Sequence, residues 1–346
     1  MNNSILIISL SIIILISLNF ILKKFHFLID INTNGAHKIS LIKTPLSGGV
    51  YFFFSFIVID YYYQIRDIYF YVFFFCFLLL GLLADNKITN NPKIRFILQL
   101  LITIFFVYFT ELSLEETRLL FLDSFLHNHF FNQFFLIFCF MTLLNGSNFI
   151  DGLNGFLTSY FVLVILAIIL IDPLLDIKLL NFEHLKLYLI PMICFIILNL
   201  FNKNFLGDGG SYFISIFFGL NLINFINDNN NQIAPFLIVN LLWYPCFENL
   251  FTIFRRSNLS KTIYLPDQNH LHTLLYIFVL NKFNKRIKSH VANSLSSILL
   301  LLCLMPMFIL SFLFYDSSIK LFYCLIIYIL AYLYIYQKLT NNEKSN

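Results

Sequence analysis

Charged residues are scarce in this chain. Asp, Glu, Lys and Arg together make up 12% of its 346 residues, whereas a typical soluble domain carries about 25%. Hydrophobic residues account for 59%, and the mean hydropathy is +0.82. A water-soluble domain is therefore excluded. The apolar residues also lack the two-residue alternation of a membrane β-strand, which leaves an α-helical bundle as the structure that satisfies every backbone polar group in a bilayer.

Several common functional signatures are also absent. The sequence has no P-loop and no GxGxxG, GxSxG or HExxH motif, and no internal repeat is evident. Its six cysteines lie singly inside apolar stretches and form no CxxC pair. A disulfide framework and a zinc site are therefore not expected.

Long apolar blocks are what the sequence does contain, and a block of about 20 residues is long enough to cross a bilayer as a helix. We predict an all-α polytopic membrane protein with about 11 transmembrane helices, forming a single membrane-embedded domain over residues 1–346. The expected spans are 4–22, 46–63, 68–84, 96–110, 130–144, 156–172, 186–201, 211–226, 233–252, 293–314 and 319–337.

The loops between these spans differ in charge. Most of the 22 Lys and Arg residues fall in alternate loops and in the C-terminal tail, and the acids favour the other set. The positive-inside rule then predicts that the N-terminus lies outside and the C-terminus in the cytoplasm. The longest and most basic cytoplasmic loop is 253–292.

One polar stretch between two apolar blocks stands out as a candidate site. It reads NGSNFIDGLNG over 145–155 and contains a single acid, Asp151. An unpaired carboxylate at the membrane boundary is costly unless it meets water, a cation or a ligand. Asn145, Asn148, Asp151 and Asn154 recur every three residues, so they share a helical face if the turn is helical. Asn amides suit hydroxyl groups and phosphate oxygens.

Two further segments combine glycine with possible anion or cation chemistry. TPLSGGV places Gly48 and Gly49 at a helix entrance, where free amides can meet an anion, although taken alone the segment favours a plain helix start. In NKNFLGDGGSYF, three glycines surround Asp208 before an apolar helix. This carboxylate could hold a hard cation such as Mg²⁺, and the alternative is a simple Asp-Gly turn.

Acidic and basic residues meet at two other places. Asp85 ends GLLAD, with Lys87, Lys93 and Arg95 just beyond, a pattern that a solvated surface pair would also give. PDQNHLHTLL places His270 and His272 in the basic loop 253–292. The surrounding charge favours phosphate binding, and zinc would need further ligands. The alternative is a pair of surface residues or helix caps.

These segments all map to the predicted cytoplasmic face. Carboxylates, glycine-freed amides and basic residues together suit a Mg²⁺-bound diphosphate. A site of this kind at the edge of a bilayer suggests one substrate from the cytosol and one from the membrane.

The chain resembles the polyprenyl-phosphate N-acetylhexosamine-1-phosphate transferases, glycosyl transferase family 4. The segments that carry the resemblance lie in the family's order between about 44 and 275. They are TPLSGG, GLLADN with KIRFILQ, NGSNFIDGLNG, FLGDGGS and NHLH.

The resemblance implies transfer of a sugar-1-phosphate from a UDP-N-acetylhexosamine to undecaprenyl phosphate, with release of UMP, to begin a surface polysaccharide or O-antigen. It implies a site on the cytoplasmic face of the bacterial inner membrane and Mg²⁺, or Mn²⁺ in its place, as cofactor. No nucleic acid partner is expected, and a homodimer is left open.

By position, the resemblance gives catalytic roles to Asp85, Asp151 and Asp208, with Asp208 and Asp151 as metal ligands. The substrate-binding residues it implies are Gly48, Gly49, Lys93, Gln99, Asn145, Asn148, Asn154, His270 and His272. His270 and His272 would bind the diphosphate, and Asp85 and Gln99 would lie near the lipid phosphate.

The chain departs from the family's usual pattern at three positions. Ala84 replaces the first of two adjacent acids, Thr273 replaces a third histidine, and Asn154 stands where the family often has Asp. A phosphate monoester has a second pKa near ~6 and is largely dianionic at neutral pH, so transfer can rest on positioning and Mg²⁺ without a base. We therefore expect an active enzyme. The alternatives are a catalytically impaired binding subunit and, in another class, a transporter.

Overall fold

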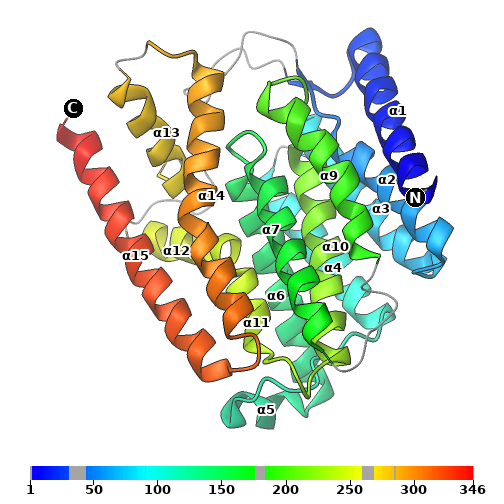
Figure 1. The fold of residues 1–346 in the computed structure, drawn as a ribbon, viewed down its shortest axis with the longest axis vertical. Coiled ribbons are helices and arrows are strands. Elements are labelled where there is room, and N and C mark those ends of the chain that lie inside the picture. Colours follow the sequence, from blue (N-terminus) through cyan, green and yellow to red (C-terminus); the bar gives the residue numbers. More distant parts are fainter. Residues whose placement is uncertain are drawn as a thin grey trace.

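The computed structural model describes residues 2–30, 44–89, 91–175, 184–258, 269–283 and 286–345, and it is almost entirely helical (Figure 1). Two short strands, β1 (Ile29–Asp30) and β2 (Thr44–Pro45), form an antiparallel ladder. The helices are α1 (Asn2–Phe25), α2 (Gly48–Tyr63), α3 (Ile68–Asp85), α4 (Pro92–Phe109), α5 (Leu120–Leu126), α6 (His129–Ile150), α7 (Phe156–Ile171), η1 (Asp172–Leu174), α9 (Leu185–Leu200), α10 (Gly207–Asp228), α11 (Phe236–Leu241), α12 (Trp243–Asn258), α13 (Leu271–Lys282), α14 (Ser289–Leu313) and α15 (Ser318–Ser345).

Helix α10 forms the centre of the bundle, and 94% of its most apolar window is buried. Its sequence is apolar around most of its circumference, which is the pattern of a helix surrounded by protein. Aromatic rings fill its contacts with α2 and α3. The Phe217 ring centroid lies 4.7 Å from that of Phe56 and 5.5 Å from that of Phe74. Aromatic packing thus holds the middle of α10 against α2 and α3.

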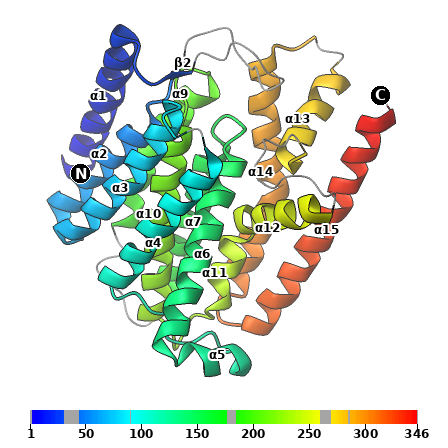
Figure 2. The ribbon, with the colours of Figure 1, turned by 180° about the vertical axis from the view of Figure 1, so that it is seen from behind.

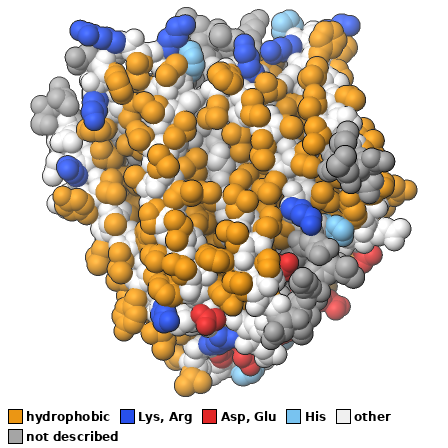
Figure 3. All heavy atoms as spheres, viewed as in Figure 1, with side chains coloured by type: hydrophobic (Ala, Val, Ile, Leu, Met, Phe, Trp, Pro, Cys, Tyr) orange, Lys and Arg blue, Asp and Glu red, His pale blue; other side chains and the backbone are white. Residues whose placement is uncertain are grey.

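The outer helices present apolar side chains away from the bundle. In α15 only 17% of the apolar window is buried, and in α4 only 22%. Within the described residues, eight helices are long and apolar enough to cross a membrane. Figure 3 shows the resulting apolar belt, with basic side chains along its upper edge and acidic ones towards its lower end. The chain is an all-α polytopic membrane protein, as predicted.

The described residues contain fewer long helices than the about eleven spans expected from the sequence. The segments expected at 46–63 and 186–201 form helices of only 16 residues each, α2 and α9. Parts of the loop 253–292 lie outside the described residues. The part that the structure describes is not simply a loop, because it contains the end of α12 and the whole of α13.

The expected single helix over 233–252 is wrong. It is broken after Leu241, and Figure 2 shows that α12 lies across the long helices. Pro245 has no backbone N–H and so leaves the Leu241 carbonyl without its helical donor. The Tyr160 hydroxyl donates to that carbonyl at 2.7 Å. Gly146 of α6 allows α12 to pass closely, because a Cβ there would lie 2.0 Å from the Pro245 oxygen.

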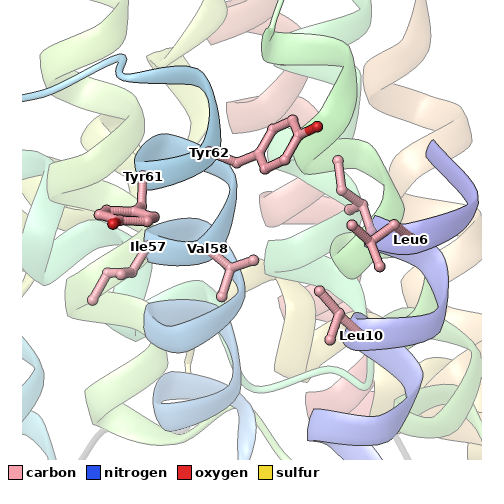
Figure 4. Close-up of a pocket in the computed structure, with 7 residues that line it drawn as sticks. Leu6, Leu10, Ile57, Val58, Tyr61 and Tyr62 are labelled. Carbon is pink, nitrogen blue, oxygen red and sulfur yellow. The ribbon is translucent and has the colours of Figure 1, made fainter. Parts of the chain in front are cut away.

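A small apolar groove of about 200 Å³ lies between α1 and α2 at the edge of the bundle (Figure 4). Its lining residues are Leu6, Ile7, Leu10, Ile57, Val58, Tyr61 and Tyr62. None of them carries a carboxylate or a basic group, so the groove offers no chemistry of its own.

Candidate functional site

The first turn of α10 meets the last residue of α3. The backbone N–H of Asp208 donates to Asp85 Oδ1 at 2.8 Å, and that of Gly209 donates to Asp85 Oδ2 at 3.1 Å. The first N–H groups of a helix have no partner within the helix, and Leu206, at the N-cap of α10, makes no capping bond with its side chain. Asp85 therefore caps α10 from another helix, where its charge also suits the helix dipole.

Glycine is what permits this close contact. A Cβ at Gly81 would lie 2.3 Å from the Cα of Gly209, and one at Gly207 would lie 2.7 Å from Asp85 Oδ2. Gly207 also has a φ of +75°, a conformation that glycine adopts readily. Packing therefore requires glycine at position 81, and packing and backbone conformation together require it at position 207.

Gly48 and Gly49 have a packing role in the structure. The Gly48 N–H donates to the Phe205 carbonyl at 3.0 Å, so this amide is already engaged. A Cβ at Gly49 would lie 2.6 Å from the Gly210 nitrogen. The two glycines allow the start of α2 to touch the start of α10, next to Asp208. The structure thus favours the plain helix-start interpretation for Gly48.

Asp208 forms an ion pair with a residue of α4. Arg95 Nη1 lies 2.8 Å from Asp208 Oδ2, and the two side chains are 31% and 26% exposed, so solvent and ligands reach them. Lys93, the basic residue that the resemblance selected, is an exposed residue on the same helix. Gln99 follows Arg95 by four residues and shares its helix face. Gln99 is buried, and its Nε2 has no hydrogen-bond partner among the described residues.

Asp151 and Asn148 complete the polar group from α6. The Asn148 oxygen accepts from the Ser211 hydroxyl at 3.2 Å, and the Asn148 side chain also hydrogen-bonds Asp208. Asp151 follows the last residue of α6. Burial first, and then the charges of Asp208 and Asp85, raise the pKa of Asp151 well above its usual range. The three acids are therefore close enough to repel one another.

The asparagines of this stretch do not share one helical face as expected. Helix α6 ends at Ile150, so Asn145 and Asn148 are helical, whereas Asn154 lies in the turn before α7. Asn145 donates to Met141 O of its own helix at 2.9 Å. Asn293 of α14 holds the turn, because its Oδ1 accepts from the Asn154 N–H at 2.5 Å. No sequence pattern predicted this contact.

His270 and His272 are buried, so they are not surface residues. His270 does stand at the N-cap of α13, as the helix-cap alternative expected, although its side chain makes no capping bond. Their rings stack with centroids 5.4 Å apart and an interplanar angle of 12°. The His270 ring lies 5.2 Å from that of Phe149, and a Cβ at Gly152 would lie 2.5 Å from His272 Nε2. Both histidines therefore pack against the segment that carries Asp151.

A buried carboxylate that the sequence analysis did not select supports His270. Glu248 of α12 is 0% exposed, and its Oε1 lies 3.0 Å from His270 Nδ1. The sequence could have identified Glu248 as a candidate, because an acid inside an apolar segment such as WYPCFENLF is unusual.

A ready-made metal cage is absent from the described residues, since no group of three or more His, Cys, Asp or Glu residues is arranged to hold an ion. Mg²⁺, however, usually takes one or two carboxylates together with water and substrate phosphates. Asp151 and Asp208 fit that donor set, because they are mutually repelling carboxylates on a partly open surface.

The fold and this site define a polytopic membrane protein with an acidic polar centre at one end of its helices. A family model described as glycosyl transferase family 4 matches residues 68–226, a range that includes Asp85, Asp151 and Asp208. Over these residues the chain is similar to glycosyl transferase family 4.

A curated relative from Bacillus subtilis (strain 168) is named probable undecaprenyl-phosphate N-acetylglucosaminyl 1-phosphate transferase. It is 26% identical over 208 residues, and the match covers 60% of this chain and 57% of the relative. The matched region is therefore less than two thirds of the relative's length.

Proposed function

We propose that this protein transfers N-acetylhexosamine-1-phosphate from a UDP-sugar to undecaprenyl phosphate. An oxygen of the lipid phosphate attacks the sugar-bearing phosphorus, and the bond from that phosphorus to the UMP oxygen breaks. The products are UMP and a polyprenyl-diphospho-sugar, the first intermediate of a surface polysaccharide or O-antigen. The observation that carries the proposal is the gathering of Asp85, Asp151 and Asp208 around the N-terminus of α10, beside Arg95.

The roles proposed for the side chains follow from their charges. Asp151 and Asp208 would hold Mg²⁺, or Mn²⁺ in its place, which supplies neutralisation of the diphosphate charge. Arg95 can bind phosphate oxygens with its planar fork of donors. His270 and His272 add ring nitrogens beside the same segment.

Asp85 has a positioning role for Asp208, because both of its oxygens accept backbone N–H groups from the first turn of α10. The neighbouring residue, Ala84, cannot act as a base. A lipid phosphate that is already largely dianionic at neutral pH, with a second pKa near ~6, needs no proton acceptor.

The orientation we propose places this centre at the cytoplasmic face of the bacterial inner membrane, with the N-terminus outside. Figure 1 shows α13 and the C-terminus at one end of the bundle and α5 at the other. The loops at the α13 end carry most of the Lys and Arg residues, which supports a cytoplasmic location for that end under the positive-inside rule. A UDP-sugar would then enter from the cytosol and the lipid phosphate from the inner leaflet.

The test is UMP release by the full-length protein in nanodiscs with undecaprenyl phosphate, Mg²⁺ and a panel of UDP-sugars. We expect at least one UDP-N-acetylhexosamine to give stoichiometric UMP and a lipid-linked diphospho-sugar. No UMP from any sugar would reject the proposal and favour a binding subunit, the alternative that Ala84 raises. Sugar-nucleotide transport into proteoliposomes without covalent transfer would instead favour a transporter.

A further inference from the structure

Glu248 is a charged group in an apolar environment. It lies on α12 and is completely buried, in a segment whose neighbours are mostly aromatic. Taking a carboxylate out of water is costly unless hydrogen bonds compensate for the loss. A helix that only packed against the bundle would not need this residue, so its partners indicate its role.

Both oxygens of Glu248 have specific partners. Oε1 lies 3.0 Å from His270 Nδ1, and Oε2 accepts from the Tyr332 hydroxyl at 2.6 Å. Thr252 Oγ1 lies 3.4 Å from the same histidine nitrogen. Tyr332 belongs to α15 and is 2% exposed, with its ring 5.0 Å from that of Phe247. The carboxylate is therefore locked between α12 and α15.

Helix α15 also holds the backbone just before His270. The Tyr336 hydroxyl donates to the Asn269 carbonyl at 3.1 Å, and the Tyr332 and Tyr336 rings stack at an interplanar angle of 10°. Helix α15 lies outside residues 68–226, the range that the family model matches. The C-terminal helix thus acts on the entrance of α13 through two neighbouring tyrosines.

A carboxylate beside Nδ1 determines which ring nitrogen carries a proton. An ionised carboxylate can only accept, so this contact favours a proton on Nδ1 and leaves Nε2 for a ligand. Nε2 donates when the ring is protonated and accepts when the ring is neutral. The stacked His272 ring and the Phe149 ring restrict rotation of the imidazole.

We propose that Glu248, held by Tyr332, is a positioning residue that fixes the His270 imidazole with a proton on Nδ1 and presents Nε2 to the phosphate-bearing substrate. The identity of the substrate rests on the proposed function. The tautomer and orientation of the ring do not, and they can be measured without any substrate.

The first experiment is ¹⁵N NMR of histidine-labelled full-length protein in nanodiscs, with His270 assigned by comparison with His270→Gln. We expect a protonated Nδ1 in the wild-type protein. In Glu248→Leu, His270 should shift towards the Nε2–H form that an unconstrained neutral histidine favours. Tyr328→Phe is the matched control, because it removes a hydroxyl from α15 without touching Glu248. An unprotonated Nδ1 in the wild type, or no change in Glu248→Leu, would overturn the proposal.

The second experiment is a double-mutant cycle on UMP release. Loss of a group that orients a ligating histidine typically lowers activity by about 10–100-fold, and we expect this of Glu248→Leu, with partial recovery in the isosteric Glu248→Gln. In a His270→Gln background, Glu248→Leu should cause no further loss, because the two residues act as a unit. Fully additive losses would show that Glu248 acts elsewhere. If the wild type releases no UMP, the proposed function fails while the NMR result still decides the role of Glu248.

Discussion

The contact between Gly81 and α10 gives the sharpest test of how the acidic centre is positioned. A Cβ at Gly81 would lie 2.3 Å from Gly209 Cα and 2.4 Å from Gly209 N. Ordinary carbon contacts need about 3.5 Å, so Gly81→Ala forces α3 and α10 apart by about 1 Å. The obstacle is backbone, which cannot rotate away as a side chain can.

That displacement lengthens the hydrogen bonds between Asp85 and the first turn of α10. The Asp208 N–H lies 2.8 Å from Asp85 Oδ1, and a further shift of about 1 Å takes the pair beyond hydrogen-bond distance. A hydrogen bond to a charged group contributes about 1.5–3 kcal/mol, and a misplacement of about 1 Å can cost about 100-fold in rate. We therefore expect Gly81→Ala to lower kcat/KM for UMP release by about 10–200-fold.

The assay compares Gly81→Ala with Gly219→Ala, which adds a methyl group to α10 itself, well beyond the first turn that carries Asp208. A Cβ at Gly219 meets side-chain atoms only, the closest being Phe140 Cε1 at 2.9 Å, and the ring can move. Overpacking costs about 1–3 kcal/mol of stability, so activity is expressed per folded molecule from size-exclusion chromatography. Gly81→Ala with wild-type kcat/KM would show that the α3–α10 contact does not position the centre.

Three further predictions concern charge. Asp208→Asn should abolish UMP release while membrane insertion persists, and full activity would remove Asp208 as a metal ligand. Arg66→Leu should lower the free energy of unfolding in detergent by about 3–5 kcal/mol, because it leaves the carboxylate of Asp60 buried without its ion-pair partner; Asp60 is 0% exposed and Arg66 Nη1 lies 2.5 Å from its Oδ2. The double variant with Asp60→Leu should recover most of the lost stability. A double variant as unstable as Arg66→Leu would contradict this prediction. An impermeant maleimide should label Leu120→Cys in intact cells and Lys93→Cys only after permeabilisation; the reverse pattern would invert the orientation.

The sequence predicts most helices correctly, because in a bilayer the backbone N–H and C=O groups of each apolar segment must hydrogen-bond to one another. It fails at 233–252 for a reason that depends on distant residues. Pro245 alone is compatible with a kinked helix. The break after Leu241 is stabilised because Tyr160 of α7 supplies the missing donor and Gly146 of α6 makes room for α12.

The candidate site, too, has features that the sequence predicts and features that it does not. Asp85, Asp151 and Asp208 could be assigned to one end of the bundle from loop charge, and the structure brings them together. Their individual partners could not be predicted. Asp85 binds backbone amides, which carry no sequence signal, and Glu248 reaches His270 from a helix whose direction depends on the break before it.

The two fully buried acids and the partly exposed acids of the centre differ in how their charge is balanced. Asp60 and Glu248 are 0% exposed, and each has both oxygens engaged, by Arg66 with Tyr188 and by His270 with Tyr332. At the α10 N-terminus, Asp208 forms an ion pair with Arg95, whereas neither Asp85 nor Asp151 forms one with a described residue.

Structural carboxylates are thus neutralised by the protein, while negative charge accumulates at this partly open centre. Such an excess favours a divalent cation that arrives with phosphate oxygens. A second acid at position 84 would increase the repulsion that this cation must balance. Ala84 removes one negative charge without removing Asp208, Asp151 or the cap that Asp85 provides for α10, so the loss of the paired acid is compatible with the transfer proposed here.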